Sequence, residues 1–176
     1  MTQRISLRTR LGNFIRRKDG SLYFWNVRDK ALHSKNPLTR WINWLKYRRL
    51  MTQFNASIPF SAQIADRPTF PHGLNGIFVS AGAKIGSGCT VFHQVTIGSN
   101  TLPDSPGQGA PVIGNNVYIG AGAKIIGGVH IGNNVRIGAN CVVTRDVPDN
   151  ATVVLERPRI ILHTDARTNK HVPFTQ

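Results

Sequence analysis

The sequence has few cysteines, few acidic residues and no long apolar run, and each scarcity excludes a class of protein. Its 176 residues include 2 Cys, and 8 Asp and Glu stand against 22 Lys and Arg. No apolar run reaches the roughly 18 residues that a membrane-spanning helix needs, so we expect none. The basic N-terminal residues lack the apolar core of a secretory signal, and we therefore expect a cytoplasmic protein.

The shortage of acidic residues leaves a formal net charge of +14, concentrated in one part of the chain. Residues 1–50 hold 13 Lys and Arg against 2 acidic residues, whereas residues 51–154 are nearly neutral. A basic extension on a neutral body indicates an anionic partner or a solvated arm that packs in an oligomer. Of the anionic partners, we expect a glycan or the inner membrane surface, where the protein would lie peripherally, and no nucleic acid.

One pattern repeats every six residues, without a break, over residues 113–148. Period six fits neither an α-helix nor an alternating strand, and it is the hexapeptide repeat of a parallel β-helix. Each six then forms one flat side of a prism, with the first and fifth positions facing inward. Aliphatic residues open the sixes at Ile113, Ile119, Ile125, Ile131, Ile137 and Val143, and small or branched residues fill the fifth position at Val117, Ala123, Val129, Val135, Cys141 and Val147.

Weaker sixes begin at Ile58, and their phase shifts once before Val79, where three extra residues (76–78) are inserted. A second interruption, 99–112, is rich in Pro, Gly, Ser and Asn and predicts a loop on the binding side of the β-helix. We therefore expect three parts. They are a basic extension (1–55), a β-helix domain (56–154) with a loop at 99–112, and a C-terminal tail (155–176).

The extension before the β-helix contains one strand-like and one helix-like segment. Residues 22–27 (LYFWNV) predict a short strand, and residues 37–51 predict an amphipathic helix. We expect the apolar stripe of this helix to cap the open first turn of the β-helix, with a membrane-surface role as the second choice. The stripe consists of Leu38, Trp41, Ile42 and Leu45.

Both cysteines occupy inward fifth positions of their sixes and predict small core side chains. Cys89 and Cys141 fall on different sides of the prism and more than two turns apart. That separation exceeds the roughly 7 Å over which a disulfide can form. We therefore expect two free, buried thiols.

Two histidines are predicted to stack in one outward-facing column. His72 and His93 are each the third residue of their six, and they lie one turn apart once the three inserted residues are subtracted. Ala121 and Ala139 follow in the same column. A neutral imidazole at such a position can act as a general base, and free backbone N–H groups beside the alanines can bind an extended amide-bearing ligand. The plain alternative is a pair of ordinary surface histidines.

The chain resembles the hexapeptide-repeat acyltransferases, and most closely the serine acetyltransferase branch. The segments that carry the resemblance are FPHGLNGIFVSAGAKIG (70–86), VFHQVTIG (91–98), residues 113–148 and ATVV (151–154). The resemblance implies an all-β fold built on a left-handed parallel β-helix, which the N-terminal strand and helix extend. It also implies a homotrimer that binds acetyl-CoA as co-substrate between neighbouring subunits.

The resemblance further implies roles for individual residues. His72 matches the general base that deprotonates the acceptor hydroxyl, and we take His93 as its catalytic neighbour. The loop 99–112 is implied to shield the thioester. The residues implied to hold acetyl-CoA are Gly120, Ala121 and Ala139 along the pantetheine and Arg157 and Arg159 at the phosphates.

The sequence departs from serine acetyltransferases where they bind the amino-acid acceptor. Pro71 stands where that branch has Asp, and Gly109-Ala110 stand where it has Arg-His. Neither charge of a serine zwitterion is therefore met at the expected place. We expect a sugar hydroxyl of a surface polysaccharide or its precursor as acceptor, with serine as the alternative. The loop side chains predicted to bind the acceptor are Asn100, Asp104 and Gln108.

Two further classes remain open at this stage. This architecture also carries zinc enzymes with three His ligands, but no third histidine falls beside His72 and His93, so we expect no metal. A non-catalytic scaffold built on a β-helix is the other alternative, and failure to bind coenzyme A would favour it.

Overall fold

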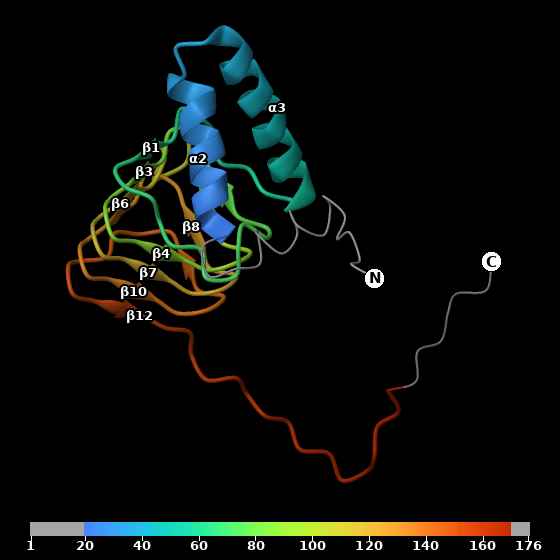
Figure 1. Cartoon of the computed structure of the whole chain (residues 1–176). Coiled ribbons are helices and arrows are strands. Elements are labelled where there is room, and N and C mark those ends of the chain that lie inside the picture. Colours follow the sequence, from blue (N-terminus) through green and yellow to red (C-terminus); the bar gives the residue numbers. More distant parts are fainter. Residues whose placement is uncertain (1–19, 170–176) are drawn as a thin grey trace, which may run out of the picture.

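The chain forms a three-sided prism of stacked turns, with two helices packed over its first turn (Figure 1). The structure is a computed structural model, and it describes residues 20–169. The predicted extension before residue 20 and the predicted tail after residue 169 lie outside the described residues. The elements in chain order are α2 (Gly20–His33), α3 (Pro37–Gln53), β1 (Gln63–Ile64), β2 (Phe78–Val79), β3 (Lys84–Ile85), β4 (Thr90–Val91), β5 (Thr96–Gly98), β6 (Val112–Ile113), β7 (Tyr118–Ile119), β8 (Lys124–Ile126), β9 (His130–Ile131), β10 (Arg136–Ile137), β11 (Val142–Val143) and β12 (Thr152–Val153).

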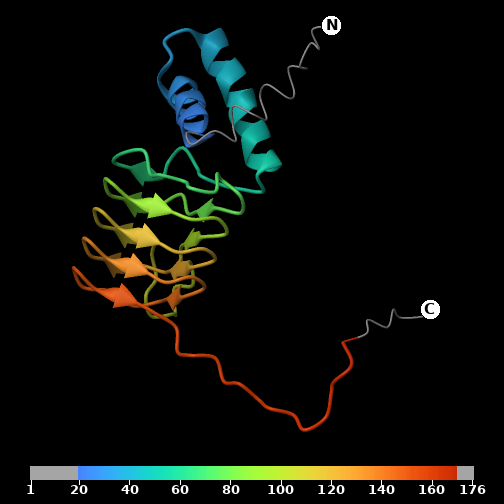
Figure 2. The ribbon, with the colours of Figure 1, turned by 60° about the horizontal axis from the view of Figure 1, so that its bottom comes forward.

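The short strands form three parallel sheets, one for each side of the prism. Their orders are β1-β3-β6-β9, β12-β10-β7-β4 and β11-β8-β5-β2. Tyr118 pairs with Arg136, so one uninterrupted turn takes eighteen residues. Gln63 pairs with Lys84, so one turn contains three extra residues, as the sequence predicts. They are not residues 76–78, because Phe78 pairs with Thr96 at the regular spacing. Figure 2 shows the turns one above the other.

The inward positions of the repeat form the core, as the period of six predicts. All six opening residues and all six fifth residues of 113–148 are buried, with exposed fractions of 0% to 6%. Parallel pairing stacks aliphatic side chains of successive turns on one another. Along one side these are Val79, Ile97, Ile125 and Val143. Because each inner side chain packs on its counterpart in the next turn, the apolar column fixes the register of the outward residues.

The described part of the extension consists of α2 and α3, so the strand predicted at 22–27 is wrong and the all-β class describes only the prism. These residues lie inside α2, where Phe24, Val27 and Ala31 are buried at helical spacing. Trp25 stacks on Phe70 of the first turn, with 5.6 Å between ring centroids. The aromatic run therefore caps the open end of the prism as a helix face.

Helix α3 covers the predicted range, but the face predicted to cap the prism points away from it. Leu38, Trp41 and Leu45 are 62%, 57% and 41% exposed. The buried residues of α3 are Asn43, Tyr47 and Leu50, and the Tyr47 hydroxyl donates to the carbonyl of Ile58. The prediction chose the capping face of α3 by its apolar residues alone. That choice was wrong because a tyrosine whose hydroxyl has a hydrogen-bond partner can be buried as well as a leucine.

A buried arginine joins α2 to the first turn of the prism. Arg28 Nη2 lies within hydrogen-bond distance of the carbonyl oxygens of Phe60 (3.2 Å) and Ala62 (3.4 Å). Its guanidinium lies between the rings of Trp25 and Phe60, at 5.8 and 5.9 Å from their centroids. Backbone carbonyls that the irregular first turn leaves without strand partners are thereby satisfied.

Cys89 and Cys141 are free and buried, as predicted. Burial raises the pKa of the Cys89 thiol, which keeps it in the neutral form. Neither described helix is long and apolar enough to cross a bilayer.

Asparagines and one aspartate hold a corner of the prism together between turns. Asn116, Asn134 and Asn150 have φ values of 54°, 57° and 61°, and their side-chain amides bond in series at 2.9 and 3.0 Å. Beside this ladder, Asp149 accepts a bond of 2.7 Å from the backbone N–H of Asn133. Hydrogen bonds from that N–H and from the Asn133 amide lower the pKa of the Asp149 carboxyl.

We predict that Asp149→Asn lowers the melting temperature at neutral pH and that the difference closes in acid. A carboxyl whose pKa is lower in the folded state stabilises the fold above its unfolded pKa, and this stabilisation is lost as the pH falls through the folded value. Melting curves of both proteins at pH 7 and at a series of pH values well below about 3.9 test this prediction, because an unfolded Asp titrates near 3.9 and the folded carboxyl titrates lower. A gap that stays constant with pH would contradict the assignment.

Candidate functional site

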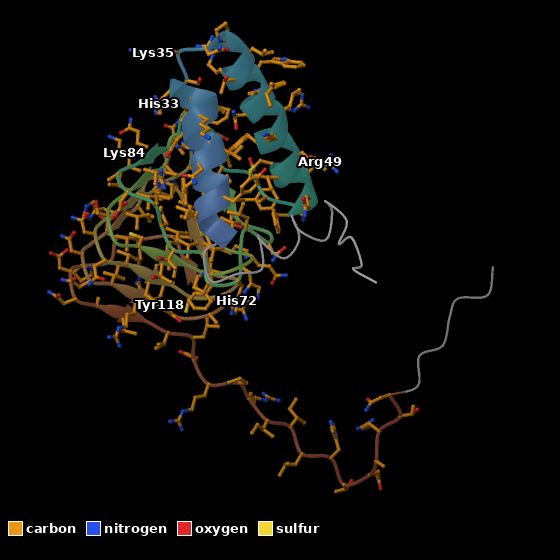
Figure 3. The ribbon with its side chains drawn as sticks, viewed as in Figure 1. His33, Lys35, Arg49, His72, Lys84 and Tyr118 are labelled. Carbon is orange, nitrogen blue, oxygen red and sulfur yellow. The ribbon has the colours of Figure 1, made fainter. Side chains whose placement is uncertain are left out.

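The two predicted histidines meet at one corner of the prism, between the sides that carry β4 and β5. Their Nδ1 atoms are 2.9 Å apart, and their ring centroids are 4.9 Å apart. His72 is exposed and His93 is half-buried, so solvent reaches the pair (Figure 3). The predicted contact between the two imidazoles is therefore confirmed. The register behind the prediction is wrong, because Phe78 pairs with Thr96 and so places Asn75, not His72, in register with His93.

Tight turns hold both imidazoles in place. The Asn75 side-chain amide donates to the carbonyl of His72 at 2.9 Å, and the Gln94 N–H donates to the carbonyl of Asn75 at 2.8 Å. Gly73 and Gln94, which follow the two histidines, have φ values of 70° and 58°. The ring of Phe92 meets His72 edge to face, with 5.2 Å between centroids.

The contact between the two Nδ1 atoms links the tautomer of one ring to that of the other. A single proton lies between them, because one ring must donate and the other accept. If His72 donates from Nδ1, its Nε2 is unprotonated and can act as a base. If His93 donates, His72 Nε2 carries the proton and is not a base. The arrangement competent for base catalysis is therefore His72 as donor and His93 as acceptor.

The column continues past the histidines to Ala121 and Ala139, as predicted. The Gly122 N–H donates to the carbonyl of His93 at 3.0 Å, and the Asn140 N–H donates to that of Ala121 at 2.8 Å. Within residues 20–169, the backbone N–H groups of Ala121 and Ala139 make no hydrogen bond. These two donors can bind a ligand that lies along the column.

Gly120 contributes to this column differently from what the resemblance implies. Its N–H already donates to the carbonyl of Ile137 at 2.8 Å, so it is not free for a ligand. A Cβ at this position would lie 2.7 Å from the nitrogen of Ala139. Gly120 therefore lets neighbouring turns approach closely beneath the two alanines.

The two sides of the histidine column differ in chemistry. On one side Phe92 contacts Tyr118, with 5.1 Å between ring centroids. On the other side lies a hollow of about 470 Å³ whose lining includes His93, Gln94 and Lys124. A flank of two aromatic rings and a flank that carries the cation of Lys124 therefore meet at the imidazole pair.

Sequence reasoning missed Lys124. Its ammonium donates to the carbonyls of Gly122 at 2.7 Å and Gln94 at 2.9 Å. An ammonium has three N–H bonds, so one remains for an anion in the hollow. Lys124 pairs in register with Thr96, which lies three residues after His93. Counting the column together with its flanking strand would have found it.

The predicted acceptor-binding loop leaves the prism at the next corner, after β5, and not beside the histidines of the same chain. Asn100 and Gly109 exchange backbone bonds of 2.8 and 2.9 Å that close its base. The Asn100 amide donates to Ser105 Oγ at 2.9 Å, so this side chain shapes the loop. Asp104 and Gln108 are exposed. A single chain therefore does not bring the loop and the two histidines together.

Arg157 and Arg159, implied to bind phosphates, lie on the tail. Figures 1 and 2 both show this segment, which follows β12, running away from the prism. Both side chains are exposed, and the single chain does not bring them to Ala121 and Ala139. Among residues 20–169, no three His, Cys, Asp or Glu side chains are grouped to hold a metal ion.

Comparison with known families identifies the repeat. Residues 110–145 match the family model of the bacterial transferase hexapeptide, with six repeats. A serine acetyltransferase of Synechococcus elongatus is 41% identical over 98 residues, which are 56% of this chain and 39% of that protein. One from Mycobacterium tuberculosis is 35% identical over 109 residues, 62% of this chain and 45% of that protein. The chain thus spans less than half the length of these relatives.

Solved structures agree. Serine acetyltransferase isoform 3 of Entamoeba histolytica, in complex with cysteine, superposes with a TM-score of 0.65 at 26% identity, over 86% of this chain and 53% of that one. A serine acetyltransferase in complex with CoA gives a TM-score of 0.54 at 28% identity, over 75% and 48%. The resemblance to hexapeptide-repeat acyltransferases, and to their serine acetyltransferase branch, is confirmed.

These comparisons overturn the sugar acceptor expected from the sequence, together with a place in polysaccharide synthesis. The relatives and structures named above are serine acetyltransferases, which supports the alternative. The expectation was based on the missing charges at Pro71 and Gly109. It overlooked Lys124, whose ammonium lies in the hollow beside His93.

Proposed function

We propose that this protein catalyses acetyl transfer from acetyl-CoA to the hydroxyl of L-serine. The observation that carries the proposal is the contact between His72 and His93 at the foot of a column with two free backbone N–H groups. We also propose for this protein the left-handed β-helix, the homotrimer and the cytoplasmic location that the resemblance implies. The acceptor and co-substrate come from the relatives, and the chemistry comes from the residues of this chain.

His72 is the general base in this proposal. Its Nε2 takes the proton of the serine hydroxyl while the hydroxyl oxygen forms a bond to the thioester carbonyl carbon. His93 Nδ1 accepts the Nδ1–H of His72, so the ring stays oriented when it becomes an imidazolium. The proton then passes to the departing thiolate as the carbon–sulfur bond breaks. Free backbone N–H groups such as that of Ala121 stabilise the developing oxyanion.

The co-substrate lies along the column above the histidines. Pantetheine is an extended chain with two amides, and the N–H groups of Ala121 and Ala139 are donors along such a line. The aromatic flank of Phe92 and Tyr118 excludes water from one side. Gly120 acts by keeping the backbone of the two turns close.

The acceptor lies in the hollow that Lys124 and Gln94 line beside His93. The third N–H of Lys124 binds the serine carboxylate, and Gln94 adds an amide. The ammonium of serine needs an acidic partner. Asp104, on the loop of a neighbouring copy, provides this carboxylate. In a trimer the loop that leaves one chain at the next corner can reach the histidine column of another.

The first prediction separates the base from its orienting neighbour. We expect His72→Ala to lower kcat by about 10²–10⁴-fold. His93→Ala should lower it by about 10–100-fold, and His93→Asn should recover most of that loss, because its amide oxygen can accept the same bond. His130→Ala, at an exposed histidine of β9, is the matched control. Equal losses in His93→Ala and His93→Asn would contradict an acceptor role.

The second prediction tests Lys124 with two acceptors. We expect Lys124→Met to raise KM for L-serine by about tenfold or more, since a charged hydrogen bond is lost. The KM for serinamide, which has no carboxylate, should change little. Because Lys124 also bonds two carbonyls, a purely structural role would impair both acceptors alike, and that result would refute carboxylate binding. Lys84→Met, on β3, is the control.

The third prediction tests the site between subunits by complementation. Replacing residues 101–108 with Asn-Gly should preserve the fold, because Asn100 and Gly109 already pair across the loop base. This variant and His72→Ala should each be nearly inactive. Co-assembled in equal amounts, they should regain about a quarter of normal activity. With random mixing, about a quarter of the clefts combine a normal His72 from one subunit with a normal loop from its neighbour. Light scattering should give a trimer.

Two results would contradict this arrangement. Full activity of the loop-shortened variant would exclude a role for Asp104 in the acceptor site. An absence of recovery in verified mixed trimers would place the loop and the base in the same chain.

A further inference from the structure

The outer face of α3 is apolar and has no partner in the described chain. This face consists of Leu38, Trp41, Ile42 and Leu45, and all four side chains are exposed. Leu38, Trp41 and Leu45 follow one another at helical spacing on the side opposite the buried Tyr47. The helix therefore has two packing faces, and only one of them lies on the prism. Exposed apolar groups gathered on one helix face mark a contact with another surface.

Basic side chains surround this face. Arg48 and Arg49 lie one turn after Leu45, and the Arg48 guanidinium lies 5.0 Å from the ring centroid of Trp44. Figure 3 shows Arg49 on α3 and Lys35 at the connection between the helices. The exposed cations of residues 20–53 are Lys30, Lys35, Arg40, Lys46, Arg48 and Arg49.

No acidic group of the helical pair balances these charges. Asp29 is the single acidic residue in 20–53, and it already pairs with Arg67 at 2.6 Å. A second copy that met the first through the same face would bring like charges together. The prism is no better partner, because residues 51–154 hold five basic and four acidic residues. The occupant of this face must therefore be both anionic and able to take up apolar side chains.

We propose that the outer face of α3 binds the surface of an anionic lipid bilayer. At such a surface Leu38 and Leu45 reach the hydrocarbon boundary, while tryptophan rings and arginines lie at the level of the phosphates. A nucleic acid would satisfy the arginines but leave the leucines in water, since its affinity comes from phosphate contacts. This proposal is independent of acetyl transfer, and it gives the basic extension a defined contact.

The test uses the full chain and vesicles of phosphatidylcholine, with or without phosphatidylglycerol. We expect co-sedimentation with the anionic vesicles only, weakening as salt is raised. Tryptophan emission should shift to shorter wavelength on binding. Trp25 is 3% exposed and already surrounded by protein, so the shift reports on Trp41 and Trp44.

A triple variant separates the apolar face from charge. Leu38→Gln, Trp41→Gln and Leu45→Gln together keep every charge of the chain, including those before residue 20. We expect at least about tenfold weaker binding to anionic vesicles, because the buried apolar area is lost. Circular dichroism and melting temperature should not change, since the three side chains are exposed. Val142→Ser, at a 64% exposed residue of β11, is the matched apolar control.

A second variant tests the charges. Arg48→Glu with Arg49→Glu should also weaken binding to anionic vesicles by at least about tenfold, whereas Lys84→Glu on the prism (Figure 3) should not. Three results would overturn the proposal. They are equal binding to vesicles without phosphatidylglycerol, unchanged binding of the triple variant, and a wild-type chain that binds no vesicles. In the last case, a loss of oligomeric mass in the triple variant would assign the face to contacts between copies.

Discussion

The structure depends on one packing constraint, which is that an aliphatic side chain must face the prism axis at every sixth residue. Each inner residue lies on its counterpart one turn earlier, as Ile119 lies on Val91 and under Ile137. Buried to within a few per cent, these columns leave little freedom in register. The packing of the inward residues therefore sets the positions of the outward side chains. Function on this fold is therefore a matter of which residue types occupy the outward positions.

The histidine pair follows from that constraint. Thr69 pairs with Thr90 and Phe78 pairs with Thr96, so the three extra residues fall between Thr69 and Phe78, at the corner where His72 meets His93. The same stacking leaves the N–H groups of Ala121 and Ala139 unbonded, because corner residues point out of the strand ladder. A pair of contacting imidazoles and a line of unbonded backbone donors thus result from the repeat itself, together with the residue types at its outward positions.

The sequence predicted the prism, its inner residues and the histidine contact, because period six and an eighteen-residue turn are properties of the chain alone. It failed where one segment packs on another. Residues 22–27 have strand-forming composition, yet the open end of the prism favours a helix that buries Phe24 and Trp25. The stripe on α3 was chosen by apolarity, whereas Tyr47 takes the buried place. Lys124 was missed because the column was counted without its flanking strand, whose register places Lys124 beside Thr96. Its two carbonyl partners are visible only in three dimensions.

We infer that the His72 column supports transfer of an acetyl group to serine. The most direct measurement is release of coenzyme A by the purified chain with acetyl-CoA and L-serine, with O-acetylserine identified by mass spectrometry. We expect saturable turnover, at kcat/KM of roughly 10⁴ M⁻¹s⁻¹ or above. Binding of acetyl-CoA without any O-acetylserine, at serine concentrations far above those of the enzyme, would contradict it.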